Sequence, residues 1–253
     1  MPVEWIFALH PSSTLRIHRM ADLAHGLFNA IVLRVPLALL VGVTALASEA
    51  LLPAGFLRLA AEQPLLLQVL EASLLGDFGI YAAHRLLHSR LLWRVHAIHH
   101  SAEDLDWLVA LRIHPAEMLL MESLSLLPVV FLGFSPAAIG LYMLIYGWMS
   151  LLNHANVRIT FGPLKWLVVG PEFHHWHHAN ETAAYNKNFA SQFVLWDWLF
   201  GTLHLPQKRR PLSYGVKEVV PAGFTDQLFY PFRRRRRATA SASAQGAAPA
   251  AAS

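Results

Sequence analysis

The chain of 253 residues contains no cysteine and few charged residues. Without thiols there is no disulfide framework, no thiolate metal site and no cysteine nucleophile, so any metal must be held by nitrogen or oxygen. Charged residues make up only 14% of the chain and apolar residues 55%, and the mean hydropathy is positive. This balance is unusual for a soluble protein and favours a membrane protein.

The two ends of the chain carry little recognisable signal. The N-terminus lacks the order of basic region, apolar run and small-residue cleavage site that a secretory signal needs. Five consecutive arginines at 233–237 begin a basic tail rich in Ala and Ser, 233–253, which we expect to be disordered. On so apolar a chain an anionic lipid surface suits these arginines better than nucleic acid, and a solvated tail without a partner is simpler still. No nucleic-acid partner is predicted.

Four apolar runs dominate the sequence, at 35–52, 65–83, 118–134 and 136–152. Their lengths lie near the lower limit of the roughly 17 to 25 residues that a membrane-crossing helix requires. Buried helices of a soluble bundle are the alternative, but four such runs in one small domain would leave too little polar surface to cover them. The sequence therefore predicts an all-α, integral-membrane bundle of about four transmembrane helices.

The distribution of basic residues predicts how this bundle is oriented. Four spans place both termini and the loop between the second and third spans on one side, which holds most of the arginines, whereas the two opposite loops hold little beyond Arg58. By the positive-inside bias the basic side is cytoplasmic. Because the composition, rich in Ala, Leu and Arg, is typical of GC-rich bacteria, we expect a bacterial inner-membrane protein with both termini and a helical cap in the cytosol.

Histidines are concentrated in three short groups on the predicted cytoplasmic side. The groups are HRLLH at 84–88, HAIHH at 96–100 and HHWHH at 174–178. Residues three and four apart share one face of a helix, so each group can direct imidazoles toward one ion. The candidate ligands are His84, His88, His96, His99, His100, His174, His177 and His178, with His154 in LLNHANV as a plausible ninth.

The number of imidazoles favours two metal ions. A single transition ion accepts at most about six ligands, and zinc normally about four. Imidazole suits iron, copper, zinc and nickel, so the ligand type does not name the metal. The HExxH pattern of a hydrolytic zinc site, which places a carboxylate base beside the ligands, is missing. Paired metals at the mouth of a membrane bundle favour redox chemistry on a lipid.

An ordered set of motifs between 74 and 203 carries a resemblance to a known group of proteins. The motifs are DFGIYAAHRLLH, HAIHHS, LRIHPAE, NHANV, PEFHHWHH and NFASQFVLWDWLFGT. Together they resemble the sterol desaturase and fatty acid hydroxylase superfamily of integral-membrane di-iron enzymes. The resemblance makes 35–232 the catalytic domain, preceded by an interfacial or cytosolic segment, 1–34.

The resemblance also implies a cofactor and a reaction. The family's ligands fall on the nine histidines named above, which would hold two non-haem iron ions. It implies an oxygenase that hydroxylates or desaturates an unactivated C–H position of a lipid, such as a sterol or a fatty acyl chain, with O2 as co-substrate. The sequence has no flavin, nicotinamide or haem-domain signature, so two electrons must come from an external reductase, ferredoxin or cytochrome.

Further polar residues are expected around the ligands or facing the substrate. They are Asp77, Tyr81, His114, Asn153, Asn156 and His175. Asp77 lies in an apolar run, where a hydrogen bond to a ligand imidazole would explain a carboxylate best. His114 could instead cap the third span, because it precedes Pro115. The remaining histidines, expected at the surface or an interface, are His10, His18, His25 and His204.

Three other functions remain open at this point. A membrane electron-transfer protein with bis-histidine haem needs paired histidines, but it leaves the HxxHH triplets without a purpose. A His-rich metal-binding or transport protein predicts ligands at bilayer depth rather than at one end of the spans. A zinc lipid hydrolase would act without dioxygen.

Overall fold

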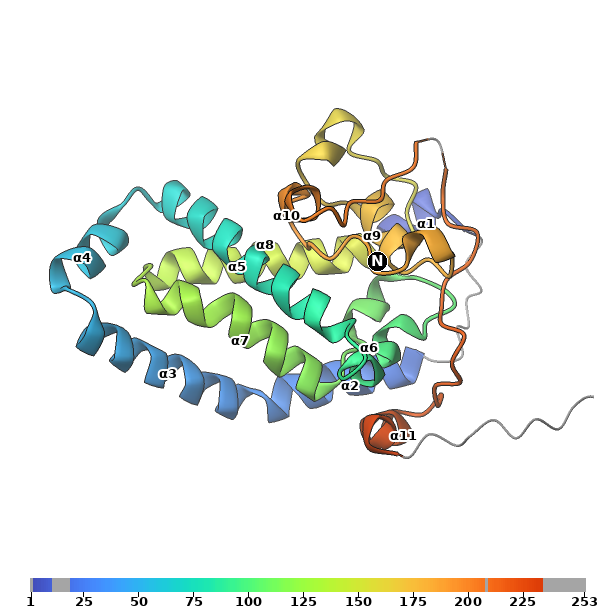
Figure 1. Ribbon diagram of the computed structural model, residues 1–253, viewed down its shortest axis with the longest axis horizontal. Coiled ribbons are helices and arrows are strands. Elements are labelled where there is room, and N and C mark those ends of the chain that lie inside the picture. The colour runs from blue at the N-terminus through green and yellow to red at the C-terminus, as the bar shows by residue number, and fades with distance from the viewer. Residues whose placement is uncertain (1, 11–18, 208, 234–253) are drawn as a thin grey trace, which may run out of the picture.

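The computed structural model describes residues 2–10, 19–207 and 209–233 (Figure 1). Its named elements in this part of the chain are all helices, so the predicted all-α class is confirmed there. The α-helices are α1 (Pro2–Phe7), α2 (Arg19–Val32), α3 (Arg34–Leu51), α4 (Ala54–Glu62), α5 (Leu65–Leu87), α6 (Trp93–His100), α7 (Pro115–Phe131), α8 (Pro136–His154), α9 (Pro171–His177), α10 (Leu195–Leu199) and α11 (Phe224–Phe229). Short 3-10 helices are η1 (Trp107–Leu111), η2 (Gly162–Trp166), η3 (Thr182–Ala184) and η4 (Tyr230–Phe232).

Four long helices, α3, α5, α7 and α8, cover the four apolar runs of the sequence. They lie side by side, with α7 packed between α3 and α5 and with α8 against α5 (Figure 1). Two of the described helices, α3 and α5, are long and apolar enough to cross a membrane by length and composition. Helix α7 has only 17 residues and includes Pro128. The crossing of all four stays a prediction.

Local signals explain where α7 and α8 meet. Helix α7 ends at Phe131, and Gly133 follows in a left-handed conformation with φ of 81°. Ser135 caps α8, because its Oγ accepts a hydrogen bond from the Ala138 backbone N–H at 3.3 Å, and Pro136 occupies the first helical turn. These residues form the tight helical hairpin that the FSP turn predicts.

The interface of α5 with α7 and α8 depends on small residues. Ala72, Val129 and Tyr142 are fully buried where the three helices meet. A Cβ atom added at Gly79 would collide with the backbone carbonyl oxygen of Leu124, so glycine lets α5 and α7 approach closely. This packing holds α5 in place, and His84 and the C-cap residue His88 lie at its C-terminal end.

The outer faces of the long helices are apolar and exposed. In α3 only Ser48 is buried, and its hydroxyl donates to the Phe131 carbonyl at 2.6 Å. Val43 of α3 and Leu144 and Trp148 of α8 are 65%, 55% and 61% exposed. An apolar surface of this extent is the kind that lipid covers.

We predict that Gly79→Ala destabilises the protein while Gly147→Ala does not. The first substitution forces α5 away from the α7 backbone, and overpacking of this kind costs about 1–3 kcal/mol. The second lies in α8, where an added Cβ meets nothing within 4 Å. Thermal unfolding in one detergent compares the two variants with wild type. Equal midpoints for both variants would contradict the close packing of α5 on α7.

Candidate metal centre

Nine histidines from four helices and their ends converge at one end of the helical bundle, where α6 and α9 adjoin the ends of α5 and α8 (Figure 1). They form two groups, within each of which the ligand nitrogens lie within 4.8 Å of one another. The first, the five-His cluster, consists of His84, His88, His96, His100 and His177. The second, the four-His cluster, consists of His99, His154, His174 and His178. These are the nine residues that the sequence predicts as ligands, and metal binding by them stays a prediction.

Hydrogen bonds among its own rings cannot account for the geometry of the four-His cluster. The Nε2 atom of His154 lies 2.9 Å from that of His174 and 3.2 Å from that of His178, and the latter two are 3.1 Å apart. A neutral imidazole nitrogen offers either one hydrogen or one lone pair. Three nitrogens that meet at one point therefore cannot all pair with one another, whereas a cation at that point would accept a lone pair from each.

The five-His cluster shows the same convergence. The Nε2 atom of His96 lies 3.1 Å from that of His84 and 3.0 Å from that of His100. The Nε2 atoms of His88 and His177 are buried and have no hydrogen-bond partner in the described structure. The two clusters adjoin, because the rings of His100 and His178 stack with centroids 4.6 Å apart. Two neighbouring ions fit this arrangement.

Backbone carbonyls fix the tautomers of four of these imidazoles. The Nδ1 atoms of His84, His99, His154 and His177 lie 2.7, 3.2, 2.8 and 2.8 Å from the carbonyl oxygens of Phe189, Arg112, Ser150 and Lys187. A carbonyl oxygen only accepts, so each Nδ1 must carry the hydrogen and each Nε2 keeps its lone pair for the cluster. Such hydrogen bonds orient the ring and raise the basicity of a ligand.

Burial keeps the imidazoles in the neutral form that a metal requires. Desolvation is the largest cause that lowers the pKa of the residues in α6 and α9, and neighbouring imidazoles lower it further. The pKa lies well below the usual value for His96, His99, His100, His174, His177 and His178. Neutral imidazoles bind a cation without first losing a proton at neutral pH.

The donor set therefore fits two transition-metal ions. All nine donors are nitrogens, which suit iron, copper, zinc or nickel. Five donors in one cluster and four in the other are fewer than the six that an octahedral ion accepts, which leaves room for further ligands. An ion would give a partner to the Nε2 atoms of His88 and His177, which are buried and have no hydrogen-bond partner among the described residues.

One carboxylate touches the clusters, and it is not the one expected from the sequence. Glu117, in the first turn of α7, accepts a hydrogen bond from His96 Nδ1 at 2.8 Å, and both side chains are 1% exposed. The prediction that Asp77 bonds an imidazole is wrong. Its oxygens accept the backbone N–H groups of 191–193 at 2.8–2.9 Å, because Asp77 lies two helical turns before His84.

A second carboxylate, Asp197 of α10, holds the segment that supplies the carbonyls. It accepts the backbone N–H groups of Phe189 and Ala190 at 2.8 and 2.7 Å and the Thr202 hydroxyl at 2.7 Å. Asp77 of α5 and Asp197 of α10 thus anchor the same loop, 186–194. The WDWLFGT motif, whose role the sequence leaves open, positions the loop whose carbonyls orient imidazoles of the five-His cluster.

The remaining residues expected beside the ligands support neighbouring segments. Tyr81 has its hydroxyl 3.1 Å from the Thr202 hydroxyl. Asn153 donates its amide to the Ser191 carbonyl at 3.0 Å. Asn156 exchanges hydrogen bonds with the backbone of His10 at 3.0 and 2.9 Å. None of these hydrogen bonds reaches a cluster imidazole, so these side chains stabilise the segments around the clusters.

Two further predicted residues, His114 and His175, lie outside both clusters. His114 caps α7, since its Nδ1 accepts from the Ala116 backbone N–H at 3.1 Å and its Nε2 donates to the Leu228 carbonyl at 3.1 Å. His175 is fully buried, with Nε2 3.1 Å from the Ala155 carbonyl and Nδ1 2.9 Å from the Tyr214 hydroxyl. Burial lowers the pKa of His175 to about 3, so it ties α9 to the end of α8 as a neutral ring.

The expectation that His25 lies at a surface or interface is wrong. It is fully buried in α2, with its Nε2 2.8 Å from the Gln227 side-chain oxygen of α11 and its ring edge-on to Phe224. The covering helix is distant in sequence, so no local pattern reveals the contact. Of the other histidines in this group, His10 is exposed, His204 is half-buried, and His18 lies outside the described residues. The predicted tail beyond Arg233 also lies outside them.

Comparison with known proteins now gives the class. The sequence profile described as Fatty acid hydroxylase matches residues 69–202, just over half of the chain. The chain belongs to the fatty acid hydroxylase family, within the superfamily that its motifs resemble. The matched range contains every residue of the two clusters. No solved structure gave a significant match.

Three known proteins are similar to this chain over part of their length. An ornithine lipid hydroxylase from Rhizobium tropici is 37% identical over 69% of this chain and 53% of its own. An alkylglycerol monooxygenase from Xenopus tropicalis is 29% identical over 55% of this chain and 31% of its own. A very-long-chain aldehyde decarbonylase from Oryza sativa subsp. indica is 33% identical over 53% and 52%. The chain thus spans about half of these relatives' length, or less.

We predict that Glu117→Gln weakens metal binding without unfolding the protein. The substitution replaces the carboxyl group that orients His96 through its Nδ1, and loss of such a partner typically lowers metal affinity about 10–100-fold. Competition with a chelator, read by metal analysis, measures the change. Glu62→Gln, at the exposed end of α4, is the matched control and should bind as wild type does. Equal affinities for the two variants would refute the role of Glu117.

Proposed function

We propose that this protein is a membrane-bound, non-haem di-iron oxygenase that hydroxylates a C–H position of a lipid. The observation that carries the proposal is the pair of adjoining imidazole clusters with Nε2 lone pairs turned inward. Membership of the fatty acid hydroxylase family favours iron and O2 over the other metals that imidazole accepts. A bis-histidine haem would use only two of the nine rings.

The proposed reaction balances with an external reductant. The substrate C–H bond, O2, two electrons and two protons give an alcohol and one water, with the substrate carbon oxidised and O2 reduced. Desaturation would instead remove two hydrogens and give an alkene and two waters. The similarity to relatives named as a hydroxylase and a monooxygenase favours insertion of oxygen. A reductase, ferredoxin or cytochrome would supply the electrons.

The chain's own residues prepare the site in three ways. Bound iron would supply the activation of O2, and the protein fixes where this happens. The carbonyls of loop 186–194 orient imidazoles, Glu117 holds the His96 ring through its Nδ1, and burial of eight of the nine imidazoles limits the access of bulk water. Exclusion of water matters because a strong oxidant that is exposed to solvent is quenched before it reaches a C–H bond.

We further propose that α3, α5, α7 and α8 all cross a bacterial inner membrane as part of a catalytic domain, 35–232. Their exposed apolar faces and the two candidate membrane helices support this arrangement. The histidines lie where α5 and α8 end, so one side of the membrane would hold the whole metal centre. The arginine bias favours the cytoplasmic side for this centre and for both termini, with 1–34 at the interface or in the cytosol.

The test is lipid analysis of cells that express the protein under 18O2. We expect a lipid species that carries one 18O atom in cells with wild type or with His10→Gln, an exposed histidine outside both clusters. His178→Gln removes a central nitrogen of the four-His cluster and should abolish the labelled product. Lipids unchanged by the wild-type protein, label that comes from water, or a strong Soret band in the pure protein would each contradict the proposal.

A further inference from the structure

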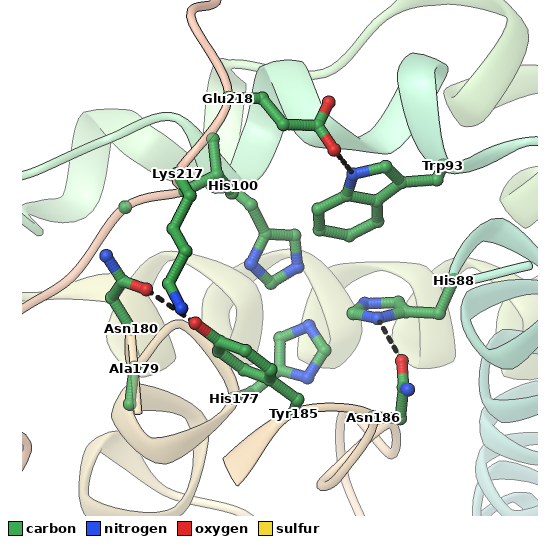
Figure 2. A pocket seen from close by; sticks show the side chains of 12 residues that line it. His88, Trp93, His100, His177, Ala179, Asn180, Tyr185, Asn186, Lys217 and Glu218 are labelled. Atoms are coloured by element: carbon green, nitrogen blue, oxygen red, sulfur yellow. Dashed lines mark hydrogen bonds between the residues drawn. The ribbon is translucent and has the colours of Figure 1, made fainter. Parts of the chain in front are cut away.

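A pocket of about 270 Å³ opens directly onto the five-His cluster (Figure 2). The imidazoles of His88, His100 and His177 form part of its lining, whereas no residue of the four-His cluster does. The pocket lies just beyond His88, the residue that ends α5. If α5 crosses the membrane, this is the depth at which lipid head groups lie.

The exposed surface of the lining is mostly apolar, and it also carries one charge of each sign. Glu218 accepts a hydrogen bond from Trp93 Nε1 at 3.0 Å, and the Lys217 ammonium lies 5.8 Å from the centroid of the Tyr185 ring. Figure 2 shows the Glu218 carboxylate directed toward Trp93 and the Lys217 ammonium directed toward Tyr185. Such a rim matches a ligand that bears both an ammonium and an anionic group.

The size of the pocket limits what can enter it. Drug-sized ligands occupy pockets of roughly 300–1,000 Å³, so this one suits a fragment about as large as an amino acid. The tails of a lipid would then remain outside while its polar end approached the metal.

We propose that this pocket binds the zwitterionic head group of the lipid substrate, with its anionic group at Lys217 and its ammonium at Glu218. The inference rests on the proposed oxygenase function and narrows it. The oxidised carbon then lies in or beside the head group, because the bound group contacts the wall that His88, His100 and His177 form. The bound head group also closes the pocket to water.

Binding of short-chain probes tests the head-group site without relying on turnover. The zwitterionic probes are N-octanoyl ornithine, with a carboxylate, and dihexanoyl phosphatidylethanolamine, with a phosphate. Octanoic acid and dihexanoyl phosphatidylglycerol have no ammonium and serve as comparisons. Calorimetry on the metal-loaded protein in detergent should give at least about tenfold tighter binding for one or both zwitterionic probes. The probe that binds more tightly identifies the anionic group.

Two variants assign the charges. Glu218→Gln keeps an oxygen for Trp93 but loses the charge, so it should weaken zwitterionic probes about tenfold and leave octanoic acid unchanged. Lys217→Gln should weaken all four probes, since each has an anionic group. Lys165→Gln, a lysine near Glu172 and outside this pocket, is the control and should change nothing. Metal content and thermal midpoint are measured for each variant.

Each outcome decides the proposal separately from the oxygenase function. Equal binding of all probes, or variants that bind as wild type does, would overturn the head-group site even if 18O-labelled lipid is formed. Labelled lipid with the oxygen deep in an acyl chain would overturn it as well. Selective binding that the variants abolish would support the site even where no lipid is oxidised, in which case the proposed reaction alone fails.

Discussion

A buried imidazole can turn one nitrogen lone pair toward a metal only if its other nitrogen has somewhere to place a hydrogen. This constraint organises much of the end of the bundle, because six of the nine rings have an oxygen atom within hydrogen-bond distance of Nδ1. Backbone carbonyls of Phe189 and Lys187 accept such hydrogens from His84 and His177. The fold therefore positions backbone carbonyl groups around the clusters as well as the histidines themselves.

Loop 186–194 is hydrogen-bonded to two segments that lie far apart in the sequence. Asp77 holds it from the middle of α5, and Asp197 holds it from α10. Within the loop, Asn186 adopts a positive φ of 57°, and its side-chain oxygen lies 3.3 Å from His88 Nδ1. Two buried carboxylates thus act on the candidate metal centre without touching it, and their hydrogen bonds to backbone N–H groups offset the cost of burying them.

The sequence predicts the helices and the convergence of the nine histidines well, for clear physical reasons. The apolar runs at 65–83 and 136–152 correspond to α5 and α8, because long apolar segments with few charges have few other structures available. The nine histidines are brought together as the sequence predicts. The pairs four residues apart, 84/88, 96/100 and 174/178, each share a cluster, whereas His99 and His177, three residues after His96 and His174, belong to the other cluster. How many helices cross a membrane depends on the surroundings and is not fixed by the fold.

The sequence does not predict contacts between distant segments. Glu117 of α7 bonds His96 of α6, and Asp77 bonds a loop more than 110 residues away, although the sequence favours Asp77 as the partner of an imidazole. His25 is hidden by α11 for the same reason. The pocket is also lined by Lys217 and Glu218, which follow the motifs in the sequence. Only the folding of the chain brings them near the five-His cluster.

The central claim is that two groups of neutral imidazoles hold a pair of redox-active ions. Metal analysis of protein purified without oxygen in detergent, combined with Mössbauer spectroscopy of 57Fe-loaded samples, tests it most directly. The account predicts two iron ions per chain whose spectra show nitrogen-rich coordination and change when O2 is admitted. A single ion per chain, or redox-inactive zinc in both clusters of a sample that oxidises lipid, would contradict it.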